Sequence, residues 1–359
     1  MENKTKLGLI FGGRSEEYEV SLMSARSILN AISPDKYQIF QIGITRQGQW
    51  LSGENVLDCF ENKQFDNLFK VSILPEPGNH AVYKVSTQDP GMYLENIAEL
   101  DIIFPILHGP YGEDGKFQSL FEIMEIPYVG AGVLSSAVSM DKGMFKDIMI
   151  AHNIPVADSI LVTKSEIKTN LEAILDKIVN KLDYPIFIKP ANMGSSVGVS
   201  KCIDKNGLIN GLHEAAKFDQ RILIEQGINA QEIEISLTGN ETIECSNPGE
   251  ICFQDDFYSY DAKYADEKSY DIIPAEIPSE TQQEILEIAK KAYRAVDCAG
   301  LARVDFLVER NTNKVILSEI NTLPGFTQIS MFPKLLLYDG MEYSEIIDHL
   351  IALAFEKHQ

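Results

Sequence analysis

Residues 301–322 read LARVDFLVERNTNKVILSEINT, two strand-like runs joined by a polar turn. Side chains alternate between the two faces of a strand, so residues of odd number share one face here. If the hairpin is symmetric and no bulge intervenes, Asp305 lies opposite Glu319, with Cβ atoms about 5 Å apart. Arg303 then lies opposite Asn321. This pattern gathers two acids, an amide and a guanidinium on one face.

The other face of the hairpin is apolar and is expected to face a core. Its residues are Val304, Phe306, Val308, Ile316 and Ile320. After the second strand, Pro324-Gly325 predicts a turn that brings the chain back over the polar face. The hairpin is therefore expected to separate a core from a functional site.

The polar face of the hairpin suits a divalent cation. Two carboxylates this close repel each other unless a positive charge lies between them. Asp305, Glu319 and Asn321 offer oxygen donors, which suit Mg²⁺ that keeps phosphate oxygens as further ligands. We therefore predict a metal site at these three residues. The alternative is a surface network of arginine and acids with no bound ion.

Length and composition limit the class of protein. A chain of 359 residues suggests two to three domains. No signal peptide or membrane span is evident, so we expect a cytoplasmic protein. The five cysteines are scattered without a CxxC motif, which indicates reduced thiols. A net charge of −22 argues against nucleic acid or an anionic membrane as a partner.

The patterns along the chain predict three units. In residues 1–140, strand-like and helix-like periods alternate, which is typical of a parallel α/β sheet. Residues 141–230 begin with a new helical pattern and carry a glycine-rich loop between strands. Strands dominate residues 231–359, which include the hairpin. The expected fold class is α/β, with α+β character in the later part.

The glycine-rich loop lies in KPANMGSSVGVS, residues 189–200. Lys189 ends a strand, and Ser195 and Ser196 follow in a loop rich in glycine. Such a loop can bind phosphates through backbone N–H groups and hydroxyls while the lysine supplies charge. It is not a Walker A loop, because the lysine precedes the glycines. A plain turn between strands is the alternative.

Two further stretches are consistent with a nucleotide site. Lys142 opens a helical pattern, although alone it would be a surface lysine. Glu225 and Glu232 flank a kink after an apolar strand. Backbone groups from Gln226 to Ile228 could bind adenine, and Glu232 could accept from ribose hydroxyls. An exposed acidic turn is the alternative for this stretch.

Taken together, these stretches resemble the ATP-grasp superfamily and, within it, the D-alanine–D-alanine ligase family. The motifs that carry the resemblance are FGGRSEEYEVSL, LHGPYGEDG, GAGVLSSAVSMDK, KPANMGSSVGVS, ECSNPGEI, FYSYDAKY, LARVDFLV and EINTLPGFTQISMFP. Their order and spacing cover nearly the whole chain. The resemblance implies an ATP-grasp fold of three domains, the first of them Rossmann-like. Gln226 and Ala230 depart from the family's pattern.

The resemblance implies an ATP-dependent ligase for peptidoglycan precursor synthesis. ATP would phosphorylate the carboxylate of one D-alanine, and a second D-alanine would attack the acylphosphate. ADP, phosphate and D-alanyl-D-alanine would result. The implied cofactor is Mg²⁺ or Mn²⁺, two ions per site, and the implied assembly is a homodimer. Phosphoryl transfer of this kind relies mainly on positioning and charge neutralisation.

The resemblance also assigns roles to individual residues. Lys142, Lys189 and Lys263 would neutralise the triphosphate. Arg303 and the backbone N–H of Gly325 would stabilise the oxyanion of the tetrahedral intermediate, and one such donor is typically worth about 10²–10³ in rate.

The substrates would contact a second set of residues. Glu19 would hold the ammonium of the first D-alanine, with His108 near its carboxylate, although a structural histidine is the alternative. Ser330 would receive the carboxylate of the second D-alanine, and Met331 would line its subsite. A hydrogen-bonded set of Glu19, Ser195 and Tyr264 would close the site.

Tyr264 favours D-alanine as the second substrate, because D-lactate-using relatives depart from the FYSYDAKY pattern. The alternatives within enzymes are a D-alanine–D-lactate or D-alanine–D-serine ligase and another ATP-grasp carboxylate–amine ligase. A non-catalytic nucleotide-binding protein is a further alternative. It is disfavoured by Arg303, because a binding protein has no need of an oxyanion arginine.

Overall fold

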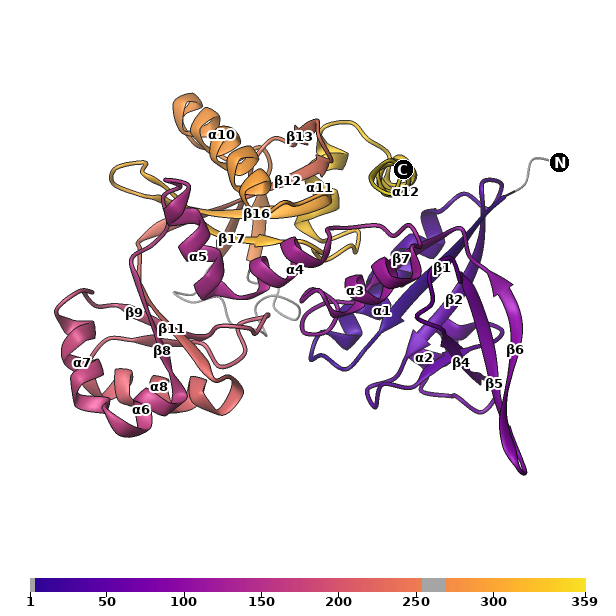
Figure 1. Cartoon of the computed structure of the whole chain (residues 1–359). Coiled ribbons are helices and arrows are strands. Elements are labelled where there is room, and N and C mark those ends of the chain that lie inside the picture. Colours follow the sequence, from indigo (N-terminus) through magenta and orange to yellow (C-terminus); the bar gives the residue numbers. More distant parts are fainter. Residues whose placement is uncertain (1–3, 254–268) are drawn as a thin grey trace.

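The computed structural model describes residues 4–253 and 269–359, which form three β-sheets with helices packed on them (Figure 1). The expected α/β class is confirmed. Lys263 and Tyr264, with the rest of the FYSYDAKY motif, lie outside the described residues. Within the described ranges, no helix is long and apolar enough to cross a membrane.

The first sheet has seven strands in the order β6-β5-β4-β3-β2-β1-β7. They are β1 (Thr5–Gly12), β2 (Tyr37–Ile44), β3 (Trp50–Ser52), β4 (Phe69–Ile73), β5 (Ala81–Gln88), β6 (Gly91–Glu99) and β7 (Ile102–Ile106). β1 is parallel to β2 and β7, as the alternating pattern predicts. β3 to β6 extend the sheet in antiparallel fashion.

Helices from both ends of the chain cover one face of this sheet. They are α1 (Tyr18–Ala31), α2 (Val56–Glu61) and α12 (Tyr343–Lys357). Leu9 of β1 and Leu350 of α12 belong to the same buried core. Asp348 of α12 accepts hydrogen bonds from Lys36 (2.6 Å) and Tyr37 (2.8 Å). The other face is covered by α3 (Lys116–Met124).

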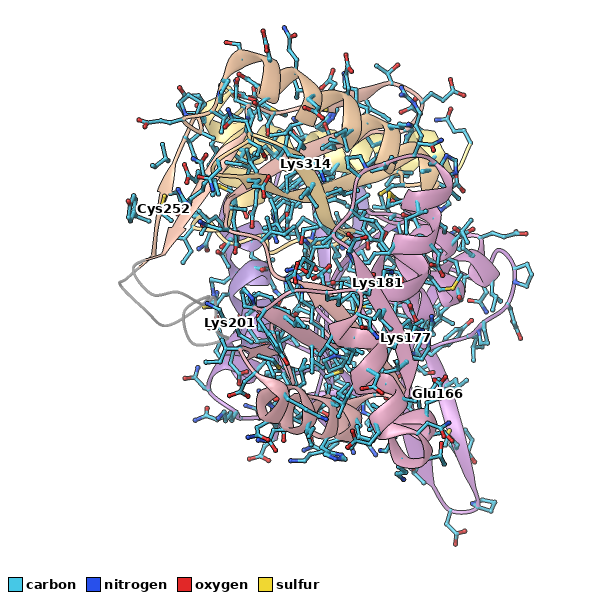
Figure 2. All side chains as sticks on the ribbon, turned by 90° about the vertical axis from the view of Figure 1, so that its left-hand side faces the viewer. Glu166, Lys177, Lys181, Lys201, Cys252 and Lys314 are labelled. Carbon is cyan, nitrogen blue, oxygen red and sulfur yellow. The ribbon has the colours of Figure 1, made fainter. Side chains whose placement is uncertain are left out.

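The second sheet is antiparallel and has the order β10-β9-β11-β8. Its elements are β8 (Ser159–Thr163), α6 (Lys164–Thr169), α7 (Leu171–Val179), β9 (Ile186–Pro190), β10 (Ser200–Cys202), α8 (Lys205–Phe218) and β11 (Arg221–Gln226). Glu166 and Lys177, labelled in Figure 2, belong to the helices that pack on it. Glu166 completes a capping box with Thr163 at the start of α6.

Two helices, α4 (Val133–Met140) and α5 (Lys142–Ala151), connect the first sheet to the second. The helix predicted over MDKGMFKDIMIAHN, residues 140–153, is confirmed by α5, whereas α4 was not predicted. α5 begins at Lys142 because Asp141 accepts hydrogen bonds from the N–H groups of Gly143 and Met144. This cap fixes Lys142 at the first position of α5.

The third sheet has six strands, with β15-β14-β12-β16-β17 in order and β13 paired to β12. Its elements are β12 (Ala230–Gly239), β13 (Ile243–Cys245), β14 (Gly249–Phe253), β15 (Ser269–Ile272), α10 (Ser279–Ala295), β16 (Gly300–Glu309), β17 (Val315–Asn321) and α11 (Met331–Tyr338). One face packs on α10 and α5 around a large apolar core. The opposite face carries the polar residues of the hairpin.

Candidate active site

The two predicted pairs of the hairpin are confirmed, although the hairpin contains a bulge. β16 and β17 pair antiparallel, with Arg303 opposite Asn321 and Asp305 opposite Glu319. All four side chains are half-buried, whereas Val304 and Ile320, on the other face, are buried in the core. Strand alternation thus gathers the charged groups on one face of the sheet.

A β-bulge changes the register beyond Asp305. Phe306 pairs with Leu317 rather than with Ser318, so Ser318 is the extra residue of β17. Ile316 is consequently opposite Leu307, on the face of the site, and not on the core face where strict alternation predicts it. Leu317 occupies the core instead. The bulge therefore places an apolar pair, Leu307 and Ile316, beside the polar cluster.

Arg303 is held by the carboxylate two residues away. Its Nε and Nη2 atoms donate to the two oxygens of Asp305 at 2.8 and 2.7 Å. Asn321 donates from Nδ2 to the same carboxylate at 2.9 Å. Burial would lower the pKa of Arg303, but the charges of Asp305 and Glu234 outweigh it and raise the pKa well above its usual value. The guanidinium is permanently charged.

Glu234 is a member of this cluster that the sequence reasoning missed. It lies on β12 directly opposite Asp305, and its Oε2 is 2.9 Å from Nε of Arg303. The alternation of polar and apolar residues in QEIEIS could have indicated it, because it puts Glu234 on the same face of the strand as the predicted Glu232. Three adjacent strands therefore each bring a carboxylate to this row of the sheet.

The glycine-rich loop bends sharply where it carries its serines. Ser195 and Ser196 have φ of 48° and 58°, and Gly198 has φ of 71°. Such left-handed conformations are costly for residues with a Cβ and are commonly found at functional sites. Ser195 donates a hydrogen bond to Oε1 of Glu17. The loop thereby contacts the N-terminal end of α1, far away in the sequence.

The carboxylate beside Ser195 is Glu17, not the predicted Glu19. Glu19 lies in the first turn of α1, its side chain is 58% exposed, and it pairs with Arg46. The ideal Cβ of an alanine at position 194 or 109 would lie 3.2 or 2.4 Å from Oε2 of Glu17, so two glycines allow that carboxylate to enter. The predicted set of Glu19 with Ser195 is therefore corrected to Glu17 with Ser195.

One lysine contacts the glycine-rich loop, and two others share the carboxylate of Glu225. Lys142 donates from Nζ to the carbonyl of Met193 at 2.7 Å. Lys189 lies 2.5 Å from Oε2 of Glu225, and the buried Lys146 lies 2.5 Å from Oε1 of the same carboxylate. Burial would raise the pKa of Glu225, but the charges of Lys189 and Lys146 outweigh it and lower the pKa to about 2. Lys146 was not identified from the sequence.

In the segment predicted to bind adenine, residues 226–228, two backbone N–H groups already donate to the protein. The N–H of Gln226 donates to Asp158 O at 2.8 Å, and the N–H of Gly227 donates to Pro185 O at 2.9 Å. The side chain of Gln226 also bonds the backbone of Asp183 in both directions. Gln226 is thus committed to the protein itself. Ile228 and Glu232, next to it, stay as predictions.

His108 joins the end of β7 to the turn after β17. Its Nε2 is 3.1 Å from Oγ of Ser24 and its Nδ1 is 3.1 Å from Leu323 O, with Glu113 3.7 Å away. Burial lowers the pKa of His108, but Glu113 outweighs it, so the net shift is upward. The contacts of both ring nitrogens give His108 a structural role in holding the turn that bears Gly325.

The turn after β17 brings Gly325 against Ser330. A Cβ added at Gly325 would lie 2.9 Å from Oγ of Ser330, so glycine allows this close approach. Thr327 donates its N–H to the same hydroxyl at 3.2 Å. Met331, the next residue, is buried at the start of α11. The sequence-predicted Gly325, Ser330 and Met331 are therefore neighbours in space.

The oxygen donors on the hairpin fit a hard divalent cation. Asn321 uses its Nδ2 on Asp305, which leaves its carbonyl Oδ1 as a donor atom of the required kind. In the described part of the chain, no group of three or more His, Cys, Asp or Glu side chains is arranged to hold a metal. An amide thus completes the predicted set of two carboxylates.

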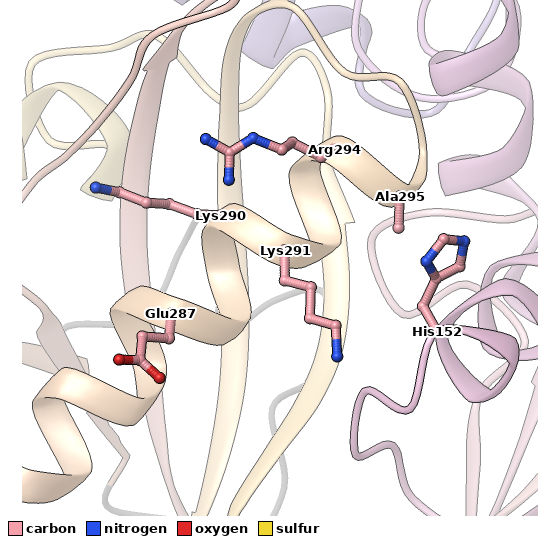
Figure 3. Close-up of a pocket in the computed structure, with 6 residues that line it drawn as sticks. All are labelled: His152, Glu287, Lys290, Lys291, Arg294 and Ala295. Carbon is pink, nitrogen blue, oxygen red and sulfur yellow. The ribbon is translucent and has the colours of Figure 1, made fainter.

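Cavities occur both beside His108 and away from the predicted site residues. One of about 110 Å³ lies behind His108 and is lined by both the Gly12–Gly13 turn and Tyr111. The other, of about 420 Å³, is an open surface pocket between the end of α5 and α10. Figure 3 shows its lining residues, His152, Glu287, Lys290, Lys291, Arg294 and Ala295. None of the predicted site residues lines this second pocket.

Comparisons with known proteins point to one family for both halves of the chain. Residues 6–131 match the family model "D-ala D-ala ligase N-terminus", and residues 148–352 match "D-ala D-ala ligase C-terminus". The chain is 43% identical to the D-alanine–D-alanine ligase of Caldicellulosiruptor bescii over 356 residues, covering 99% of this chain and 96% of that one. It is 46% identical to that of Thermoanaerobacter pseudethanolicus over 361 residues, covering 99% and 98%.

Solved structures agree. The VanG D-Ala:D-Ser ligase from Enterococcus faecalis has a TM-score of 0.85 at 33% identity, with 98% of this chain and 100% of that chain covered. The D-alanine–D-alanine ligase from Coxiella burnetii has a TM-score of 0.81 at 30% identity, with 99% and 95% covered.

Proposed function

The chain belongs to the D-alanine–D-alanine ligase family, and from this membership we propose that it joins two D-alanine molecules with ATP, releasing ADP and phosphate. The product, D-alanyl-D-alanine, serves peptidoglycan precursor synthesis. The observation that carries the proposal is the pair of family matches, which span both halves of the chain.

The triphosphate is bound between the glycine-rich loop and two lysines. Lys142 and Lys189 neutralise phosphate charge, and Ser195 and Ser196 supply hydroxyl and N–H donors. The contact of Lys142 with the loop carbonyl at Met193 supports this arrangement, because it brings charge and loop together. Lys263, from outside the described residues, adds a third positive charge.

The first D-alanine is bound by Glu17 rather than Glu19. A carboxylate at this point can hold the substrate's ammonium group, and the hydrogen bond with Ser195 orients it. His108 keeps the floor of this subsite in place through Leu323. Closing the loop over the substrate excludes water, which would otherwise hydrolyse the acylphosphate.

The tetrahedral intermediate carries an oxyanion that needs fixed donors. Arg303 and the N–H of Gly325 supply them, and loss of such a donor typically costs about 10²–10³ in rate. Ser330 receives the carboxylate of the second D-alanine, and Met331 lines the apolar side of its subsite. The contact between Gly325 and Ser330 supports this assignment, because it joins the two functions in one turn.

Asp305, Glu319 and Asn321 hold the divalent cation, for which we propose Mg²⁺ or Mn²⁺ with two ions per site. When bound, the cation neutralises charge on the phosphate oxygens. Adenine contacts Ile228, and Glu232 accepts from the ribose.

A second candidate is a D-alanine–D-serine ligase. It is favoured by one observation, the TM-score of 0.85 with a ligase of that name. Tyr264 is the residue on which the choice of second substrate depends, and it lies outside the described residues.

The test is phosphate release from ATP with each of D-alanine, L-alanine, D-serine and D-alanine plus D-lactate, with products identified by mass spectrometry. We expect D-alanine alone to give phosphate and D-alanyl-D-alanine. A dominant mixed product with D-serine or D-lactate would identify the alternative acceptor. ATP hydrolysis indifferent to D-amino acids would contradict the proposed function.

We also propose that the protein is a cytoplasmic homodimer. Each chain would consist of three domains, with boundaries at about residues 140 and 230. The strands of the three sheets fall within 5–106, 159–226 and 230–321, which supports this division. Light scattering should give twice the chain mass of 40.1 kDa. Limited proteolysis should cleave near the two boundaries first.

A further inference from the structure

We propose that Glu234 is a positioning residue that holds the guanidinium of Arg303 in the orientation needed to receive the oxyanion. This inference rests on the proposed function, in which Arg303 stabilises the tetrahedral intermediate. No sequence motif pointed to Glu234, and its place beside Arg303 follows only from the pairing of β12 with β16.

The geometry of three strands isolates Glu234 on one side of the arginine. β16, which bears Arg303 and Asp305, is flanked by β12 on one side and by β17 on the other. Glu319 and Asn321 approach from β17, whereas Glu234 approaches from β12. The side chain of Glu234 is only 8% exposed, and its Oε2 lies 2.9 Å from Nε of Arg303.

The carboxylate of Asp305 has several partners, whereas Glu234 contacts Arg303 from the other side. Both oxygens of Asp305 accept from Arg303, and one also accepts from Asn321. Asp305 is also a proposed metal ligand, so its carboxylate has to face the ligands on β17 as well. Glu234 is on the opposite side. The single Nε–H of Arg303 is donated to Asp305, so Glu234 acts on the guanidinium through the charge of its Oε2, 2.9 Å from Nε, rather than through a hydrogen bond.

Asp305 and Glu234 both lie against the Nε edge, which leaves the Nη1 group of the guanidinium for the reaction. Arginine has five N–H donors in a rigid planar fork, so fixing one edge fixes the direction of the other. A donor that is oriented in advance stabilises developing charge without reorganisation. Without Glu234, Asp305 alone would hold the guanidinium of Arg303. The guanidinium would then move with the Asp305 side chain and would point its free N–H groups at the oxyanion for less of the time.

The kinetic test uses Glu234→Gln, which keeps the volume and removes the charge. We expect kcat to fall by about tenfold or more, with KM for ATP and for D-alanine changing by less than about twofold, because Arg303 acts on the transition state. Glu234→Asp, which restores the charge on a shorter side chain, should recover part of the loss. The matched control is Glu250→Gln, a buried glutamate of neighbouring β14 that accepts from Gln231 instead.

A second readout does not depend on turnover. In protein labelled with ¹⁵N-arginine, the Nε–H signal of Arg303, one of seven arginines, is assigned from its loss in Arg303→Lys. This proton is donated to Asp305, so its exchange with water reports how firmly the guanidinium is held. With Mg²⁺ and ADP bound, Glu234→Gln should speed this exchange about tenfold, whereas Glu250→Gln should not. Unchanged kcat, or unchanged exchange, would overturn the role of Glu234. If the wild type made no D-alanyl-D-alanine, the proposed function would fail, and the exchange measurement would still test the contact.

Discussion

Glu17 and Glu19 are two positions apart, yet only Glu17 contacts the glycine-rich loop. At the start of a helix, side chains two positions apart project about 200° from each other. Since α1 begins at Tyr18, Glu17 is its N-cap and Glu19 lies on the outer face with Arg46. Three acids occur between positions 16 and 19, and the sequence does not reveal where the helix begins. That is why the sequence paired the wrong glutamate with Ser195.

Replacing Glu17 and Glu19 separately with glutamine tests this correction. Glu17→Gln should lower kcat/KM for D-alanine by roughly a hundredfold, because the variant lacks the charge that binds the ammonium. Glu19→Gln should change it by less than about twofold, since an exposed ion pair contributes little. Steady-state kinetics on both variants would measure this, and a larger loss in Glu19→Gln would restore the original assignment.

Glu225 contributes stability that depends on pH. Its pKa is lowered to about 2 by Lys189 and Lys146, so its contribution is complete above the unfolded-state pKa of 4.5 and is lost as pH falls through about 2. Glu225→Gln should destabilise the protein at pH 7 by on the order of 3 kcal/mol, because two lysines lose a buried partner.

Urea unfolding of wild type and Glu225→Gln at several pH values would measure this effect. The difference between the two proteins should shrink between pH 4.5 and about 2. A difference that is constant over this range would show that the ion pair is not its source.

At the scale of elements, the cap of α5 connects folding to nucleotide binding. Asp141 caps the helix, contacts Arg221, and accepts from Asn192 in the glycine-rich loop at 3.1 Å. Asp141→Ala should lower stability by about 1–2 kcal/mol and also raise KM for ATP several-fold, because both Lys142 and the loop lose a support. Thermal unfolding and ATP titration of the rate would measure the two effects.

The control for this prediction is Asp204→Ala. Asp204 caps α8 by accepting from Gly207 N at 2.7 Å. It should show a similar loss of stability and an unchanged KM for ATP. If both variants changed KM equally, the effect would come from general loosening rather than from the loop.

The hairpin could be predicted from sequence because both of its faces have a distinct chemistry. Alternating acids and aliphatic residues fix its register, and pairing partners 303 with 321 and 305 with 319 followed directly. The bulge at Ser318 carries no such signal, because serine is tolerated in either place. Strand β6 was missed for a related reason: most of its residues are exposed, so it lacks a buried face to reveal its period.

Contacts between distant segments were the least predictable part of the site. Glu234 and Lys146 act through partners on other elements, and only the folded sheets bring them together. Gly325 and Ser330 were named from the resemblance, and their proximity in one turn agrees with their short separation in the sequence. The contacts of Glu234 and Lys146 depend instead on the pairing of strands and helices, which the local sequence pattern does not contain.

At the scale of the whole molecule, binding of nucleotide and metal should stabilise the fold together. A ligand at a hundred times its Kd adds about 2.7 kcal/mol to the free energy of unfolding. A non-hydrolysable ATP analogue should therefore raise Tm by a few degrees with Mg²⁺ present. EDTA should remove most of this shift, and Glu319→Ala should lack it while keeping its own Tm without ligand.

Differential scanning fluorimetry would measure these shifts. An equal shift in EDTA would mean that the nucleotide binds without the cation. An equal shift in Glu319→Ala would exclude Glu319 as a ligand.

The packing of α12 on the first sheet has a consequence for synthesis in the cell. The strands of that sheet leave the ribosome early, but Leu350 and its neighbours, which complete one apolar face, are translated only after the other two sheets. Until then the nascent chain exposes a surface prone to aggregation or chaperone binding. Translation of α12 thus sets the moment at which the first sheet can become native.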